Sequence, residues 1–184
     1  MRLLGKNDKK DYKKGQEIIR RIGVRAIIIE DGKIYLSYSD RNKFYKLPGG
    51  GVNKGETIVK ALKRETLEEV GITIDPKCIK RYGLFIDKWR SIRLNDMDKI
   101  WFQKSICFIC KRQGEIKDIM PTDSEILDKC QMKFVDINKA IATNEARMKS
   151  IEYSPKERFL ERETYLFKLI KKELIEKNKK KWKF

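Results

Sequence analysis

The most restrictive feature of the sequence is the position of three glutamates near the end of a predicted helix. Residues 56–70 have helical periodicity, and the apolar side chains at the start of one face are Ile58, Ala61 and Leu62. The same stripe continues with Glu65, Glu68 and Glu69. Carboxylates in this arrangement repel one another by about 0.2–0.5 kcal/mol per pair. If this face packs on the protein body, a positively charged group must lie nearby to compensate the three carboxylates.

Two arrangements would accommodate the glutamates. A fully solvated charged face is one, but the acids share the apolar face, where unpaired charge is unfavourable. Arg64 is placed to pair with one of the three and cannot offset them all. Clustered carboxylate oxygens are the ligands that Mg²⁺ and Mn²⁺ prefer. The pattern therefore favours a divalent metal site.

A glycine-rich loop precedes this helix. Gly49, Gly50 and Gly51 lack Cβ atoms and let the backbone approach a ligand closely. A tight turn is the alternative. Next to an acidic helix, the loop is better explained as a cradle for phosphate, with the Gly49 carbonyl as a metal ligand. Asn53 and Glu56 are a candidate capping box for the helix.

The segment "GVNKGETIVKALKRETLEEVGI" with the preceding glycine resembles the Nudix box, G-x5-E-x7-R-E-U-x-E-E-x-G-U, in which U is a bulky aliphatic residue. The fixed positions that match are Gly50, Glu56, Arg64, Glu65, Glu68, Glu69, Gly71 and Ile72. Thr66 replaces an aliphatic residue and is close to Val in size. The resemblance implies a Nudix hydrolase of the MutT-like type, which cleaves a pyrophosphate bond in a nucleoside diphosphate derivative with Mg²⁺ or Mn²⁺.

The resemblance also implies roles for the box residues. Glu68 and Glu69 are expected to be metal ligands, and Glu65 either a ligand or the general base. Arg64 and Glu56 are expected to pair with each other or with the box glutamates and to orient them.

In some family members a distal loop carboxylate is the base. In "PTDSE" the best candidate is Glu125, with Asp123 next and solvated acids as the alternative.

Substrate contacts are predicted before the glycine loop. Arg25 is either a phosphate ligand or a surface cation on a strand. Phe44 and Tyr45 point to opposite sides of a short strand, so one is free to stack on a base while the other packs in the core. Lys46 shares a face with Phe44 and lies beside the loop, within reach of phosphate. Gly50 and Gly51 are the predicted backbone contacts.

The order of elements predicts a Nudix-type α/β/α sandwich around a mixed β-sheet. Residues 1–20 are expected to be a basic arm, loose or docked as an edge element, residues 21–177 one domain, and residues 178–184 a basic tail. Residues 24–39 read as a hairpin that turns at Asp31–Gly32. Further strands are predicted near 44–48, 79–87, 99–112 and 131–137. "SPKE" at 154–157 is a helix start, and the last helix runs toward Lys177.

Composition limits the chemistry further. The chain lacks histidine, which excludes histidine bases and histidine-ligated zinc. "CFIC" lies in a predicted strand, so its cysteines read as reduced core thiols rather than a redox or metal motif.

The formal net charge of +17 predicts weak polyanion or RNA binding through a basic surface. No apolar run is long enough for a membrane span, and no secretory signal is evident, so a cytoplasmic protein is expected.

The substrate is expected to be a nucleotide, most simply a nucleoside triphosphate. The Pro or Tyr that marks the ADP-ribose and dinucleoside-polyphosphate groups is missing from "IDKWR", and Trp89 or Trp101 is placed to supply a stacking surface. An RNA 5′-end hydrolase and a catalytically idle nucleotide sensor are the alternatives. The intact carboxylate pairs speak against the sensor. The sequence carries no signal for an oligomeric state.

Overall fold

The computed structural model describes residues 1–92 and 94–177. Its centre is a seven-stranded mixed sheet with strand order β1-β5-β6-β2-β3-β4, and β7 pairs with β3. The pairs β1–β5 and β2–β6 are parallel, and the other pairs are antiparallel. The strands are β1 (Leu3–Asp8), β2 (Ile18–Glu30), β3 (Lys33–Ser39), β4 (Phe44–Lys46), β5 (Ile74–Arg90), β6 (Ile100–Arg112) and β7 (Cys130–Val135).

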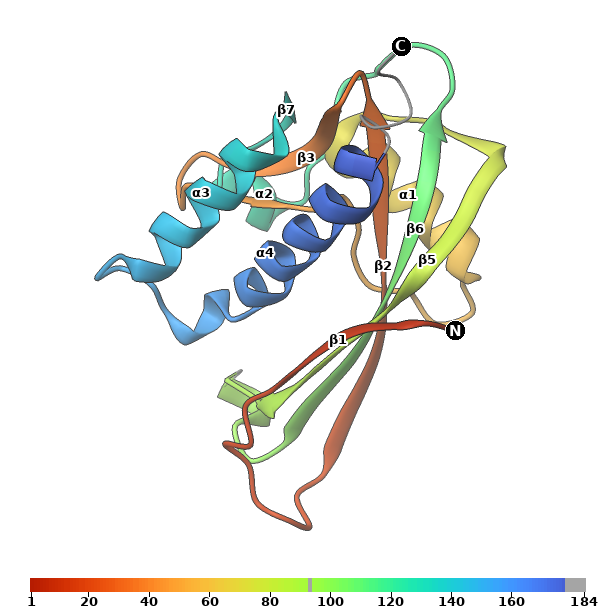
Figure 1. The fold of residues 1–184 in the computed structure, drawn as a ribbon. Coiled ribbons are helices and arrows are strands. Elements are labelled where there is room, and N and C mark those ends of the chain that lie inside the picture. The colour runs from red at the N-terminus through yellow and green to blue at the C-terminus, as the bar shows by residue number, and fades with distance from the viewer. Residues whose placement is uncertain (93, 178–184) are drawn as a thin grey trace.

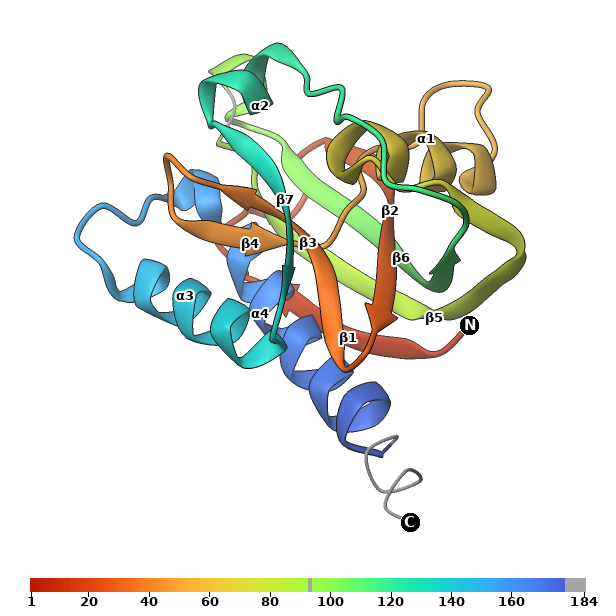
Figure 2. The same ribbon diagram turned by 90° about the horizontal axis from the view of Figure 1, so that it is seen from above.

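Helices cover both faces of the sheet (Figure 1, Figure 2). They are α1 (Ile58–Val70), α2 (Asp123–Leu127), α3 (Ile137–Lys149) and α4 (Phe159–Ile170), with 3₁₀ turns at Leu94–Asp96 and Pro155–Glu157 and a π-helical segment at Lys171–Glu176. This is the α/β/α sandwich that the sequence predicts. None of the described helices is both long and apolar enough to cross a membrane.

The alternation of β2 produces two cores. Val24, Ala26 and Ile28 are fully buried on the face that packs against α1. Ile27, which points the other way, belongs to the core beneath α3 and α4. Because Arg25 shares the α4 side of β2 with Ile27, the strand also carries a cation into that layer.

The predicted hairpin is confirmed. Glu30 pairs with Lys33, and Asp31 and Gly32 between them have positive φ angles of 46° and 75°, as a tight two-residue turn requires. The strands extend further than their patterns suggest. β5 begins at Ile74 rather than near residue 79, because Ile74 already pairs with Arg112 of β6, ahead of an irregularity between Ile74 and Ile79.

The N-terminal segment follows the edge-element alternative, because residues 3–8 form β1 beside β5. Tyr165 on α4 donates a hydrogen bond to the Leu4 carbonyl at 2.8 Å. The two terminal nitrogens of Arg2 bind the two oxygens of Glu173 at 2.9 and 2.6 Å. The C-terminal helical segment therefore clamps the first strand.

The "SPKE" signal is confirmed with one difference. Ser154 and Glu157 form the reciprocal capping contacts, but the turn they start is a 3₁₀ turn that leads into α4. The apolar stripe of α4 is buried as expected, with Leu160, Leu166, Phe167 and Ile170 fully covered. The predicted basic tail, 178–184, lies outside the described residues.

Candidate active site

Helix α1 begins one residue after the predicted capping pair. The hydroxyl of Thr57 accepts a hydrogen bond from the Lys60 N–H, so Thr57 is the N-cap. Asn53 and Glu56 do bind each other, but within the preceding loop, where Glu56 accepts the Asn53 N–H at 3.0 Å. The proposed capping box was therefore wrong for the helix, because Thr57 offers a side-chain acceptor nearer to its first turn.

Only one of the three box glutamates lies on the core face of α1. Glu69 is 7% exposed, and the buried stripe runs from Leu62 through Thr66 to Glu69. The side chains of Glu65 and Glu68 are 14% and 32% exposed, at the side of that stripe. The expectation that the whole stripe becomes acidic was wrong, because a 3.6-residue period continues from Leu62 to Thr66 instead. Thr66 is tolerated there because its hydroxyl donates to the Leu62 carbonyl at 2.7 Å.

Arg64 binds several carboxylates rather than one. Its Nε lies 2.9 Å from Glu56 Oε1, and its Nη1 lies 2.7 Å from Glu65 Oε1 and 3.1 Å from Glu68 Oε2. The predicted pairing of Arg64 with Glu56 and the box is present. The Arg64 hydrogen bond, with help from the Asn53 N–H, lowers the pKa of Glu56 to about 2. The planar guanidinium has enough donors to orient all three acids.

A second cation neutralises Glu69. Lys46 Nζ, at the end of β4, lies 2.7 Å from Glu69 Oε1 and 3.2 Å from Glu125 Oε1. Arg64 alone does not reach all three glutamates, as expected, but it binds two of them rather than one, and Lys46 binds the third. Burial raises the pKa of Glu69 to about 7, against the opposing attraction of Lys46. Burial acts on Glu125 too, but hydrogen bonding with Glu69 and the charge of Lys46 outweigh it and lower the pKa of Glu125 to about 2.

The glycine loop passes between β2 and α1. Gly49 has a positive φ of 141°, and a Cβ there would lie 2.1 Å from the Val24 carbonyl oxygen. A Cβ on Gly50 would lie 2.3 Å from a Glu65 carboxylate oxygen. Gly49 contacts the site through its N–H, which donates to Glu69 Oε2 at 2.9 Å. Its predicted role as a carbonyl ligand stays a prediction.

Three box glutamates and the distal glutamate of α2 face one cavity of about 560 Å³, namely Glu65, Glu68, Glu69 and Glu125. Asp128 and Glu157 also line it. The structure thus brings the distal acid on α2 to the box, whereas Asp123 is exposed on the same helix. Across residues 1–92 and 94–177, acidic and cysteine side chains form no ready-made cluster of three around a metal position. Lys46 and Arg64 lie among the carboxylates instead.

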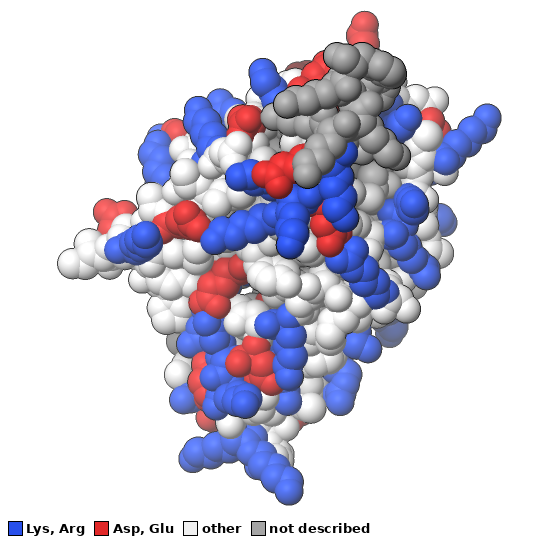
Figure 3. Space-filling model, in the orientation of Figure 1, with Lys and Arg blue, Asp and Glu red and all other residues white. Residues whose placement is uncertain are grey.

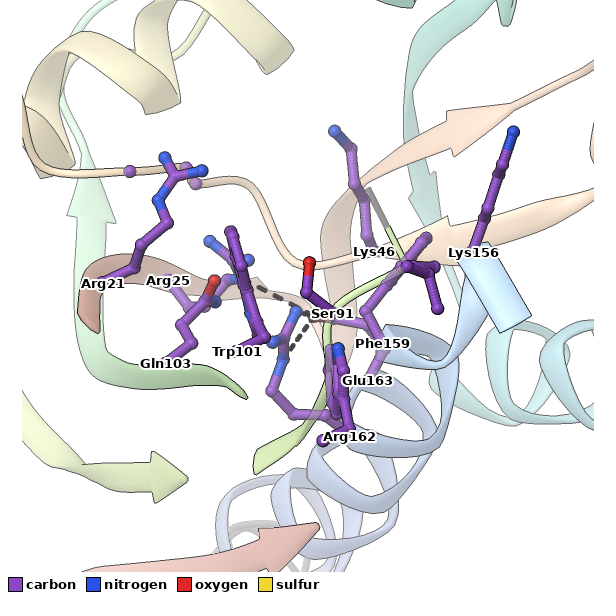
Figure 4. Close-up of a pocket in the computed structure, with 15 residues that line it drawn as sticks. Arg21, Arg25, Lys46, Ser91, Trp101, Gln103, Lys156, Phe159, Arg162 and Glu163 are labelled. Atoms are coloured by element: carbon purple, nitrogen blue, oxygen red, sulfur yellow. Dashed lines mark hydrogen bonds and ion pairs between the residues drawn. The ribbon is translucent and has the colours of Figure 1, made fainter. Parts of the chain in front are cut away.

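A second cavity, of about 360 Å³, adjoins the first on the α4 side of the sheet. Lys46, Lys156 and Phe159 line both cavities. Figure 4 shows these three on one side of the second cavity, and Arg21, Trp101 and Gln103 on the other. The Arg21 guanidinium lies 5.3 Å from the centre of a Trp101 ring. The acidic cavity therefore opens onto one that combines cations, aromatic rings and the glycine loop.

The predicted substrate contacts line these cavities. Arg25 lines the second cavity, and its side chain is 11% exposed and 3.6 Å from Glu163, so it is not a surface cation. Gly50 and Gly51 line the same cavity. Phe44 lines the acidic cavity and packs edge-on against Phe159, while Tyr45 packs in the core beneath α3 and α4, and both side chains are buried.

Sequence reasoning missed a buried charge network beneath the second cavity. Arg162 binds Asp87 and, at 2.8 Å, Glu163, and all three residues are almost fully buried. Glu163 also accepts the Leu47 N–H at 2.8 Å. A signal was present, because Glu163 occupies a stripe position of α4 between Leu160 and Leu166. The same argument that singled out the acids of α1 would have found it.

The cysteines of "CFIC" are core thiols, as predicted. Cys107 and Cys110 are buried in β6, and burial raises the pKa of each thiol to about 12. All four cysteines are free.

Comparisons with known proteins agree with this geometry. Residues 19–157 match the family model described as the NUDIX domain. An 8-oxo-dGTP diphosphatase of Buchnera aphidicola from Acyrthosiphon pisum is 31% identical over 96 residues, which cover 45% of this chain and 77% of that protein. The 8-oxo-dGTP diphosphatase of Buchnera aphidicola from Schizaphis graminum is 34% identical over 82 residues, which cover 36% of this chain and 63% of that protein.

Two solved structures share the fold. A MutT protein from Bacillus halodurans superposes with a TM-score of 0.52 at 17% identity, covering 80% of each chain. A NUDIX hydrolase from Nitrosomonas europaea superposes with a TM-score of 0.51 at 18% identity, covering 80% of this chain and 90% of that one.

Proposed function

The chain belongs to the NUDIX family of hydrolases, and from this premise we propose that it is a Mg²⁺- or Mn²⁺-dependent pyrophosphohydrolase of nucleoside triphosphates. The observation that carries the proposal is the junction of two cavities, one lined by the box glutamates and further carboxylates and the other by cations and aromatic rings. The products are a nucleoside monophosphate and pyrophosphate. The cytoplasmic nucleotide pool is the proposed setting.

The donor chemistry supports a divalent metal. Carboxylate oxygens are the ligands that Mg²⁺ and Mn²⁺ prefer, and Glu65 presses so closely on the Gly50 backbone that no Cβ would fit between them. We assign Glu68 and Glu69 as ligands, with Glu65 and the Gly49 carbonyl as further candidates. When bound, the metal would activate water and offset charge on the phosphate oxygens.

The chain's own residues supply positioning and proton transfer. Arg64 and Glu56 fix the box carboxylates through the guanidinium contacts. Glu65 and Glu125 are the candidates to take the proton of the attacking water. We favour Glu125, because it faces the cavity from a separate element, α2, and is not one of the box carboxylates proposed to hold the metal. The attack is direct, since no histidine or activated nucleophile is part of the site.

The second cavity supports a nucleotide substrate. Arg25, Lys46 and Lys156 present positive charge beside the glycine loop, where a phosphate chain would lie. Trp89 and Trp101 line the same cavity and offer stacking surfaces for a base. The curated relatives are 8-oxo-dGTP diphosphatases, so we propose an oxidised purine triphosphate as the first substrate to test.

The distribution of charge favours a small nucleotide over RNA. On the face seen in Figure 3, lysines and arginines are scattered among acidic residues over helices and strands alike. The high net charge is thus dispersed on this face rather than gathered into one track for a polyanion. An RNA 5′-end substrate remains the second candidate and is an arm of the experiment.

The experiment is product identification in water labelled with heavy oxygen. The protein is incubated with Mg²⁺ and, separately, with canonical and oxidised nucleoside triphosphates, dinucleotides and 5′-triphosphate RNA. We expect monophosphate and pyrophosphate, with the label only in product. Hydrolysis of RNA ends alone would overturn the nucleotide-pool assignment, and label retained on a protein side chain would overturn direct attack by water. Nucleotide binding without turnover would identify a sensor.

A further inference from the structure

Lys46 occupies an unusual position for a lysine. Its side chain is 23% exposed, and its Nζ lies between Oε1 of Glu69 and Oε1 of Glu125, at 2.7 and 3.2 Å. These two carboxylates come from different elements, α1 and α2. Lys46 itself is the last residue of a third element, β4, and lines the same cavity. The ammonium is therefore the point at which three separate segments meet.

The remaining oxygens of both carboxylates are already satisfied. Glu69 Oε2 accepts the Gly49 N–H at 2.9 Å. Glu125 Oε2 accepts from the backbone and hydroxyl of Thr122 at 3.0 and 2.8 Å. Each carboxylate thus turns one oxygen toward the same cation and uses the other for a fixed hydrogen bond. A cation with oxygen ligands would be satisfied at this position.

Arg64 does not fill the same role. Its guanidinium holds Glu56, Glu65 and Glu68, and its many donors allow it to keep one partner while another turns away. Lysine is a compact point charge on a flexible stem, without a fixed fork. Lys46 lines both cavities, whereas Arg64 lines the acidic cavity alone. An ammonium released from Glu69 would still face the cationic cavity, where we place phosphate.

We propose that Lys46 is an exchangeable counterion, which holds Glu69 and Glu125 in the metal-free protein and yields Glu69 to a divalent ion while its ammonium turns to the substrate phosphates. The inference rests on the proposed function, because Glu69 is taken as a metal ligand. Lys46 and the metal then compete for one carboxylate. Because such coupling is reciprocal, each weakens the hold of the other.

The competition predicts opposite effects of one substitution. In Lys46→Met, the two buried carboxylates lose their counterion, so the metal-free protein should melt at a lower temperature. The same variant should bind Mn²⁺ more tightly than the parent, by about 5- to 150-fold, the usual range of coupling between two sites. A residue needed only for structure would lower the melting temperature without improving the affinity for metal.

Lys156→Met is the matched control. Lys156 lines the same two cavities, and within residues 1–92 and 94–177 no ion pair of its ammonium is found. Its removal takes the same charge from the cavity walls but no counterion from Glu69. It should therefore change the affinity for Mn²⁺ much less than Lys46→Met does. If both substitutions change the affinity for Mn²⁺ equally, Lys46 acts only through the positive charge of the cavity wall, and the proposal is overturned.

The measurement is titration calorimetry with Mn²⁺ on parent and both variants, beside thermal melts in chelator. If the parent binds Mn²⁺ and Lys46→Met binds it no better, the counterion proposal fails while the metal-dependent function stands. If neither binds Mn²⁺, both fail.

A second measurement uses the unmodified chain, in case Lys46→Met does not fold. Acylation of lysines is followed by mass spectrometry with and without Mn²⁺, and Lys46 should become several-fold more reactive when the metal is bound. Unchanged reactivity would overturn the exchange.

Discussion

Glu163 on α4 accepts a hydrogen bond from the backbone N–H of Leu47 at 2.8 Å, although the two residues are 116 positions apart in the chain. Leu47 is followed directly by Pro48 and the glycine loop. The loop is held in turn by β2, where Ala26 and Val24 donate to the carbonyls of Pro48 and Gly50. A fully buried carboxylate on the last helix thus fixes the backbone that presents the Gly49 N–H to Glu69.

Replacing Glu163 with Ala should destabilise the fold by about 3–5 kcal/mol, as expected when one partner of a buried ion pair is removed. Arg162 and Arg25 would be left with Asp87 as their only buried acid among the described residues. The measurement is urea unfolding. Glu161→Ala is the control, because Glu161 is on the same helix but its pair with Lys9 is one-third exposed, so the loss should be about 1 kcal/mol or less. Equal losses would show that the buried network has no special role.

Glu69→Gln should separate stability from activity. Gln keeps an oxygen for the Gly49 N–H and removes a charge that burial penalises, while Lys46 keeps its contact with Glu125, so the metal-free protein should melt at the same temperature or higher. Turnover should fall on the order of a hundredfold or more, as for loss of a preorganised electrostatic group. Thermal melts in chelator and in Mg²⁺ test both statements. A variant that is clearly less stable in chelator and gains as much from Mg²⁺ as the parent would show that Glu69 is structural.

The two acids of α2 should differ in their effect on turnover. Glu125→Gln removes the carboxylate with which α2 faces the acidic cavity, and we expect a loss of about 10²- to 10⁴-fold in kcat, the range for general acid–base groups. Asp123→Asn changes an exposed side chain on the same helix and should leave kcat unchanged. Steady-state kinetics on both variants is the measurement. A loss of kcat in Asp123→Asn but not in Glu125→Gln would assign the role of distal base to Asp123.

Trp101 should contribute to substrate binding rather than to chemistry. Stacking of a base on an aromatic ring contributes about 1–3 kcal/mol, so Trp101→Ala should raise KM by about 5- to 150-fold with a smaller change in kcat. Phe102→Ala is the control, since the next residue of β6 points to the opposite face of the sheet. A KM for Trp101→Ala that matches the parent would place the base elsewhere.

Glu173 should make a pH-dependent contribution to stability. Hydrogen bonds from Arg2 and Tyr82 lower the pKa of Glu173 to about 2 in the folded protein, below its ordinary value. A lowered pKa gives stability that is present above the unfolded pKa of about 4.3 and is lost as the pH falls through the folded pKa. Glu173→Gln should therefore cost about 1 kcal/mol at pH 7, and this difference from the parent should shrink between pH 4 and pH 2.

Urea unfolding of parent and variant across that pH range is the measurement. Glu176→Gln, which removes a half-exposed acid from the same segment, serves as the control. A difference between parent and Glu173→Gln that stays constant with pH would contradict the assignment.

The elements around the box were predicted well because their signals are local. The period of residues 56–70 predicts the helix, and three glycines after Pro48 predict the loop that precedes it. What the sequence could not supply is which cation meets which acid. The contact of Lys46 with Glu125 depends on how α2 docks, and a short polar helix carries little signal for that. The pairing of Arg21 with Trp101 depends on the parallel register of β2 and β6, which no local pattern specifies.

The contacts by which the C-terminal helical segment holds β1 affect how the chain folds during synthesis. Residues 3–8 are synthesised before both of their partners, because Leu3 lies beside Leu84 of β5 and the acid that binds Arg2 is Glu173. Contacts between such distant segments form slowly, because a long loop must close before they stabilise anything. We therefore expect β1 to dock late in folding. A chain whose translation stalls before Glu173 exposes that sheet edge to chaperones and to its neighbours on the polysome.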